Sequence, residues 1–119
     1  MPYMLLILEP VGQREDRSDA EGRLLYERMQ HYAAELQTRG LLRGAESLAS
    51  QRTATRVGRA SPNGALQVLD GPFAEAKEMV GGYFVLDCAD REQAVEIALA
   101  CPAAEWATVE VRELGPYFL

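Results

Sequence analysis

Short apolar runs along the chain predict the strands of one small sheet. Residues 3–8 form an unbroken apolar run, which is typical of a central strand covered on both faces. Residues 81–87 are rich in Tyr, Phe and Val and predict a second buried strand. Val109 and Val111 alternate with polar residues, which indicates a half-exposed final strand. Residues 41–48 favour a further short strand, although their period is unclear.

Two amphipathic stretches with capping signals predict helices. Ser18 followed by Glu21 fits a capping box, and Gly40 supplies a natural stop for a long helix. Asp90 begins a second helix, which ends before Pro102. The first helix places four apolar residues on a narrow stripe, namely Leu25, Met29, Tyr32 and Leu36. The second helix buries Ala94, Ile97, Ala98 and Cys101, with Gln93 placed to return the capping bond.

A β-hairpin is predicted between the two helices. Asn63 and Gly64 lie between the β-prone runs 53–57 and 65–69, and Asn-Gly in that setting is a strong hairpin signal. Residues 70–73 then break the strand pattern, because Gly permits a positive φ and Pro fixes its own. We therefore expect a two-stranded arm that ends in a tight corner.

The order strand, helix, strands, helix, strand predicts an α+β fold. It favours a ferredoxin-like split βαβ sheet with an inserted β-hairpin and both helices on one face, in a single domain over residues 1–119. The other face of the sheet would leave the apolar strands near Tyr3 and Tyr83 in water. A second identical chain offers the simplest cover, so we predict a homodimer.

Composition excludes several classes of partner and cofactor. The net charge of −6 argues against nucleic-acid binding. Apolar runs are too short for a membrane span and no signal peptide is evident, so a cytoplasmic location is expected. One His and two distant cysteines predict neither a zinc site nor a disulfide. Glycine-rich nucleotide motifs are missing, so we expect no cofactor. Nucleophile motifs are also missing, so covalent catalysis has no visible agent.

Several segments resemble a known family. They are YMLLIL near the start, GLLRGAESL after the first helix, DGPFAEAKE at residues 70–78, and later GGYFVLD and CPAAEWATVEVREL. Together they resemble the DGPF-domain family, part of the YCII-related group. The resemblance implies a dimeric α/β barrel, in which two ferredoxin-like sheets pack face to face with a cleft at their margin. It names a fold and no reaction.

The two candidate catalytic residues are Asp70 and His31. Asp70 ends a strand and would act as a general base in a cleft, or it would serve the turn by accepting hydrogen bonds from nearby amides. Relatives in the wider group carry a helical His thought to pair with an Asp, and that His would fall near Arg28 or Met29. His31 does not match that position and lies off the apolar stripe. It would therefore either act as a proton shuttle or lie on the solvent-exposed side of the helix.

Five further residues are candidates for substrate binding. Tyr3 and Tyr83 would direct hydroxyls into a dimer cavity or simply pack. Phe73 would form an apolar wall of the binding site and would not take part in catalysis. Glu75 and Lys77 would orient a substrate or form a solvated ion pair.

Two functions are consistent with these observations. The first is a small-molecule binding protein or cofactor-independent enzyme of unknown substrate, using acidic and tyrosine side chains in a cleft of the dimeric barrel. The alternative is a non-catalytic interaction module linked to sigma-factor-type transcription regulation, because genes of DGPF-type proteins often lie beside those of alternative sigma factors. Its surface would be the hairpin, residues 53–69. Arg52, Arg56 and Arg59 along the hairpin would hold an anionic ligand or protect the strand edges.

Overall fold

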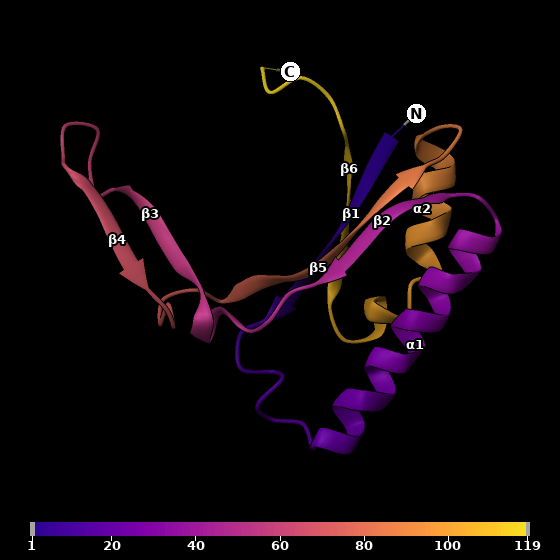
Figure 1. The fold of residues 1–119 in the computed structure, drawn as a ribbon, viewed down its shortest axis with the longest axis horizontal. Helices are drawn as coiled ribbons and strands as arrows, with labels where there is room; N and C mark the ends of the chain where they lie inside the picture. Colours follow the sequence, from indigo (N-terminus) through magenta and orange to yellow (C-terminus); the bar gives the residue numbers. More distant parts are fainter. Residues whose placement is uncertain (1, 119) are drawn as a thin grey trace.

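A four-stranded antiparallel sheet organises residues 2–118, the part of the chain that the computed structural model describes (Figure 1). The spatial order of its strands is β2-β5-β1-β6. Their bounds are Pro2–Pro10 for β1, Leu42–Ser47 for β2, Glu78–Asp87 for β5 and Thr108–Glu113 for β6. With one helix after β1 and another after β5, this order is compatible with a ferredoxin-like fold. The predicted α+β class is confirmed.

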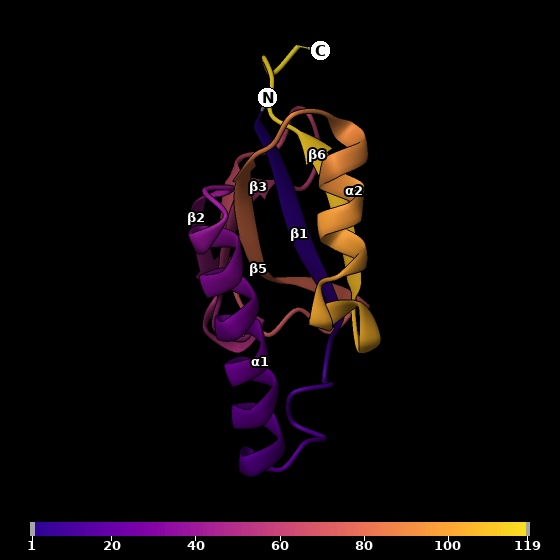
Figure 2. The ribbon, with the colours of Figure 1, turned by 90° about the vertical axis from the view of Figure 1, so that its right-hand side faces the viewer.

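Both helices, α1 (Asp19–Thr38) and α2 (Arg91–Leu99), cover the same face of the sheet (Figure 2). The predicted caps are confirmed, because the Ser18 hydroxyl accepts the Glu21 amide at 3.1 Å and the Asp90 carboxylate accepts the Gln93 amide at 2.9 Å. The Gln93 side-chain oxygen accepts a hydrogen bond from the Ala89 amide at 2.6 Å, and not from the amide of the cap residue as predicted. Gly40 follows α1 at φ +72°, as a glycine stop requires. After α2, a 3-10 turn η2 (Pro102–Glu105) leads into β6.

Strand alternation divides β1 between two environments. The odd positions from Tyr3 to Glu9 are buried against the helices, and the even positions Met4, Leu6 and Leu8 are only half-buried. One protomer therefore covers one face of its central strand and leaves an apolar row on the other.

No helix within residues 2–118 combines the length and apolarity that a membrane crossing requires.

The predicted hairpin is confirmed as a two-stranded arm, residues 51–70, which projects from the side of the sheet opposite the helices (Figure 1). It contains the short turn η1 (Gln51–Thr53) and the strands β3 (Thr55–Arg59) and β4 (Leu66–Asp70), which pair with Val57 opposite Val68. The Cα radius of gyration is 16.2 Å, whereas a compact domain of this length has about 13.5 Å. The arm therefore makes the protomer unusually extended.

The corner after β4 joins the end of the arm to its first residues. The Gly71 amide donates to the Ala54 carbonyl at 2.7 Å, and a Cβ on Gly71 would lie 2.1 Å from the Gln51 carbonyl oxygen. Phe73 is buried, and the Arg56 guanidinium lies 3.7 Å from the centroid of its ring. This close approach of two chain segments explains why a glycine stands at position 71.

Candidate functional site

A cavity of about 450 Å³ lies between the first half of α1 and the sheet. The apolar stripe predicted for α1 is present, but only its second half is packed, because Tyr32 and Leu36 are buried whereas Leu25 and Met29 are half-exposed. Leu25 and Met29 line the cavity, as do Trp106 and Phe84. We call this cavity the α1 hollow. It has the size and the mainly apolar lining of a small-molecule pocket.

Small residues on the sheet keep the α1 hollow open. Gly81 and Gly82 of β5 and Ala45 of β2 line the sheet side, where longer side chains would otherwise meet α1. The register of β1 against β5 shifts between Ile7 and Leu8, so Gly81 is the extra residue of a β-bulge. Because glycine and alanine have little or no side chain, they do not fill the space between the sheet and the apolar face of α1.

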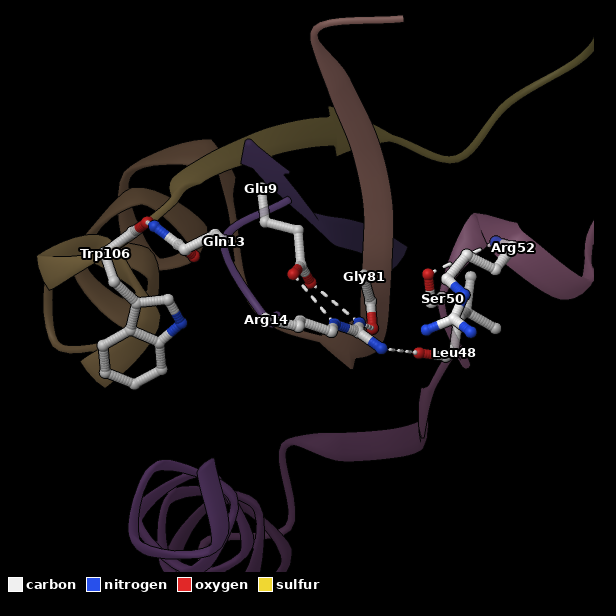
Figure 3. Close-up of polar contacts among 8 residues, drawn as sticks. All are labelled: Glu9, Gln13, Arg14, Leu48, Ser50, Arg52, Gly81 and Trp106. Carbon is white, nitrogen blue, oxygen red and sulfur yellow. Dashed lines mark hydrogen bonds and ion pairs between the residues drawn. The ribbon is translucent and has the colours of Figure 1, made fainter. Parts of the chain in front are cut away.

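An ion pair forms one wall of the α1 hollow (Figure 3). Glu9 is only 7% exposed, and its two carboxylate oxygens accept bonds from Nε and one terminal nitrogen of Arg14 at 2.9 and 2.8 Å. The guanidinium also donates to the carbonyl oxygens of Leu48 at 2.8 Å and Gly81 at 3.4 Å. We call this Glu9–Arg14 pair the clasp, because it joins β1 and the loop after it to β5 and to the residue that follows β2.

The clasp is electrically neutral, and both oxygens of the Glu9 carboxylate accept hydrogen bonds from Arg14. The bond to Glu9 raises the pKa of Arg14, so its guanidinium stays charged. Bidentate Arg–carboxylate geometry is the strong form of this interaction. A Cβ on Gly81 would lie 1.7 Å from the Glu9 carboxylate, so the clasp depends on a glycine at that position.

Trp106 and Arg17 line the α1 hollow on the other side, and Arg28 also lies near the Trp106 ring. Gln13 donates to the Trp106 carbonyl at 2.7 Å, and the guanidinium carbons of Arg17 and Arg28 lie 5.9 and 5.5 Å from the indole centroid. Arg28 also forms an ion pair with Glu105, and this hydrogen bond lowers the pKa of the Glu105 carboxyl. Arg17 lines the α1 hollow and makes no ion pair within residues 2–118.

The predicted catalytic residues do not lie in the α1 hollow. Asp70 is exposed at the base of the arm, where its carboxylate accepts a hydrogen bond from the Thr55 hydroxyl at 2.9 Å. His31 is exposed on α1 and is not among the residues that line the hollow. The structure therefore does not bring Asp70 and His31 together with this cavity.

The predicted binding residues are also dispersed. Tyr83 borders the α1 hollow, although strand alternation places its ring on the uncovered face, opposite Leu6. Tyr3 lies in the helix-covered core, where burial raises the pKa of its hydroxyl, and Phe73 lies at the arm corner. Glu75 and Lys77 are exposed in the segment that leads into β5.

Sequence reasoning missed the residues that shape the cavity. Glu9 continues the inward alternation of Tyr3, Leu5 and Ile7, so a carboxylate in that phase signals a buried acid that needs a partner. Arg14, five residues later, is that partner. From the sequence, the pair Gly81 and Gly82 predicts only the start of a strand. No group of three or more potential metal ligands occurs in the part of the chain that the structure describes.

Comparison with known proteins identifies the family. Residues 1–117 match the YCII-related domain. An uncharacterised protein of Rhizobium meliloti (strain 1021) is 42% identical over 52 residues, a match that spans 42% of each chain. The family match covers almost the whole sequence and agrees with the YCII-related resemblance found in its motifs. The chain belongs to the YCII-related domain family.

Proposed function

We propose that this protein binds a small molecule in the α1 hollow. The observation that supports this proposal is the unpacked half of the α1 stripe: Leu25 and Met29 face a cavity of about 450 Å³ and not a packed sheet. At about 30 Å³ per water, this space holds roughly fifteen waters. It therefore suits a small molecule better than a peptide. The hollow lies within one protomer, whereas the resemblance implied a cleft between two sheets.

Binding is better supported than a particular reaction. Glu9 is engaged on both oxygens by Arg14, so it is poorly placed to accept a proton from a ligand. Cofactor-independent catalysis by Asp70 and His31 stays a prediction. If Asp70→Asn leaves ligand binding and any turnover unchanged in a folded protein, the acid/base role fails.

Gly22 offers a direct test, because it lines the α1 hollow and a Cβ there would meet no atom within 4 Å. Gly22→Phe should fill the space without disturbing the packed core, and Gly22→Ala is the matched control that leaves most of it open. The probe is phenylnaphthylamine, a neutral dye that fluoresces in apolar surroundings. We expect Gly22→Phe to weaken dye binding at least about tenfold and Gly22→Ala to leave it within about twofold. Equal binding by both variants would contradict the proposal.

We also propose that the arm and the uncovered sheet face are covered by a second copy of the chain. The protomer exposes 8259 Å², whereas a compact protein of this mass exposes roughly 6,400 Å². The difference exceeds the roughly 800 Å² per partner that a standard interface buries. One face of the arm carries Val57, Leu66 and Val68, each more than 60% exposed. Exposed apolar surface of this kind marks an interaction site.

Charge supports a second copy as the occupant. Residues 51–70 carry three arginines and one acid, a net charge of +2, so the rest of a chain with net charge −6 carries −8. A basic arm is therefore attracted to the acidic body of another copy. A regulatory protein, the alternative considered from the sequence, would use the same exposed arm.

The solution mass tests the dimer. At micromolar concentration, sedimentation should give a dimer, and Val57→Lys with Val68→Lys should give a folded monomer. Leu99→Lys is the matched control, because Leu99 is 78% exposed on α2, away from the arm. A wild-type monomer would contradict the dimer and would leave the proposal for the α1 hollow intact.

A further inference from the structure

We infer that the α1 hollow selects a monoanion with an apolar body, held by Arg17. This inference rests on the proposed function and specifies the ligand chemistry.

Among the described residues around the cavity, one cation has no acidic partner. Glu9 and Arg14 neutralise each other in the clasp. Glu46 also borders the cavity, but it is exposed and lies opposite Tyr83 in the sheet register, so its side chain belongs to the uncovered face. Arg17 is half-buried and forms no ion pair within residues 2–118. The interior therefore carries one uncompensated positive charge.

Neighbouring acids are occupied or solvent-exposed. Asp19, close to Arg17 in sequence, is paired with Arg23 at 2.8 Å, and Glu105 is paired with Arg28. Glu15 and Asp16 are exposed. A half-buried guanidinium beside an apolar cavity gains most from an anion that enters with the ligand, because hydrogen bonds between charged groups strengthen when water is displaced.

Arg17 is held in position for this role. Its guanidinium lies over the Trp106 ring, and the Trp106 backbone is fixed by Gln13. The Arg17 amide donates to the Arg14 carbonyl at 3.3 Å. One short loop therefore carries both Arg14, which is neutralised by Glu9, and Arg17, which is not paired with an acid among the described residues. An aromatic face leaves the edge donors of a guanidinium available, and those donors match a carboxylate or sulfonate.

The apolar body of the ligand would contact α1 and the sheet. Leu25, Met29 and Ala33 line the helix side, and Phe84 lines the sheet side. The expected ligand is therefore a small carboxylate or sulfonate with a hydrocarbon or aromatic body. A polyanion fits less well, because Arg17 is the single cation left unpaired at this cavity in the described part of the chain.

Two dyes that differ by one charge test the inference. Anilinonaphthalenesulfonate carries a sulfonate on the ring system of phenylnaphthylamine, which is neutral. Arg17→Gln should weaken the sulfonate dye about tenfold, the worth of one charge-assisted hydrogen bond, and leave the neutral dye within about twofold. Arg17→Lys should retain most of the sulfonate affinity because the charge is kept. Arg23→Gln is the matched control, since Arg23 is exposed and paired with Asp19.

The outcomes separate the two proposals. If Gly22→Phe displaces both dyes but Arg17→Gln changes neither, the anion inference is wrong and the pocket stands. If Gly22→Phe displaces neither dye, the proposed function itself fails. Loss of both dyes in the variant with Val57→Lys and Val68→Lys, with Gly22→Phe unaffected, would assign the dyes to the arm and overturn both. Circular dichroism of each variant confirms that it is folded.

Discussion

Gly81→Ala should break the clasp, although alanine is usually harmless in a strand. The new Cβ would lie 1.7 Å from Oε1 and 2.8 Å from Cδ of Glu9, and 3.1 Å from a terminal nitrogen of Arg14. Real Cβ atoms essentially never approach another atom closer than 3.0 Å. Gly81 does not have a positive φ, so the backbone itself accepts alanine. The whole cost therefore falls on the carboxylate, which must leave its site.

The cost can be worked from the burial of the pair. Breaking a buried ion pair costs about 3–5 kcal/mol. The Arg14 side chain is 31% exposed and regains some hydration, and alanine recovers about 0.5–1 kcal/mol of backbone entropy in the unfolded chain. We therefore expect Gly81→Ala to lower the free energy of unfolding by about 2–3 kcal/mol.

Urea unfolding followed by the fluorescence of Trp106, the one tryptophan of the chain, measures this change. Protein concentration must be held constant, because a dimer makes stability depend on it. In a Glu9→Ala background the clash is gone, so Gly81→Ala should cost less than about 0.5 kcal/mol. An equal cost in both backgrounds would refute the clash as the cause, and no cost in the wild type would refute the clasp.

Three further predictions concern the core and α1. The Tyr32 hydroxyl donates to the Ile97 carbonyl, and burial raises the pKa of this hydroxyl above its ordinary value of 10.0. The folded state therefore holds the proton more tightly than the unfolded state. The contribution of Tyr32 to stability is complete below pH 10 and declines as the pH rises further. Tyr32→Phe should therefore flatten the loss of stability above pH 10 while costing about 1 kcal/mol at pH 7, and identical urea midpoints against pH for both proteins would contradict this. Burial also raises the pKa of the Cys88 and Cys101 thiols, so a thiol reagent should label the native protein slowly and the urea-unfolded protein completely; fast native labelling would show that these sites are open. Gly22→Ala should raise the free energy of unfolding by about 0.5–1 kcal/mol, because helix formation costs alanine less entropy and its Cβ meets open space; destabilisation would mean that the helix does not tolerate a side chain there.

The features predicted correctly from the sequence are those that depend on local chemistry. Ser18 and Asp90 cap helices through amides three residues away, and Asn63-Gly64 closes a hairpin within a few residues. The interior apolar strand was recognisable because residues 3–8 contain no polar position. These signals do not require knowledge of what the distant segments do.

The α1 hollow could not be predicted in the same way. It depends on a one-residue bulge that places Gly81 beside Glu9, and on α1 passing over glycines from a strand some fifty residues later in the chain. The sequence indicates Asp70 as a site residue because it ends a strand, but the corner that follows it closes the base of the arm. A turn signal cannot distinguish the rim of a cavity from the root of a hairpin.

The methionine methyl groups provide the most direct test of ligand binding in the α1 hollow. Met29 lines the hollow, whereas Met4 lies on the uncovered face of the sheet. With carbon-13 methyl labels and Met→Leu variants for assignment, titration with anilinonaphthalenesulfonate reports which site is occupied. If the dye binds in the α1 hollow, the Met29 signal moves in a saturable way and the Met4 signal does not. Saturable movement of Met4 with Met29 unchanged would contradict binding in the α1 hollow.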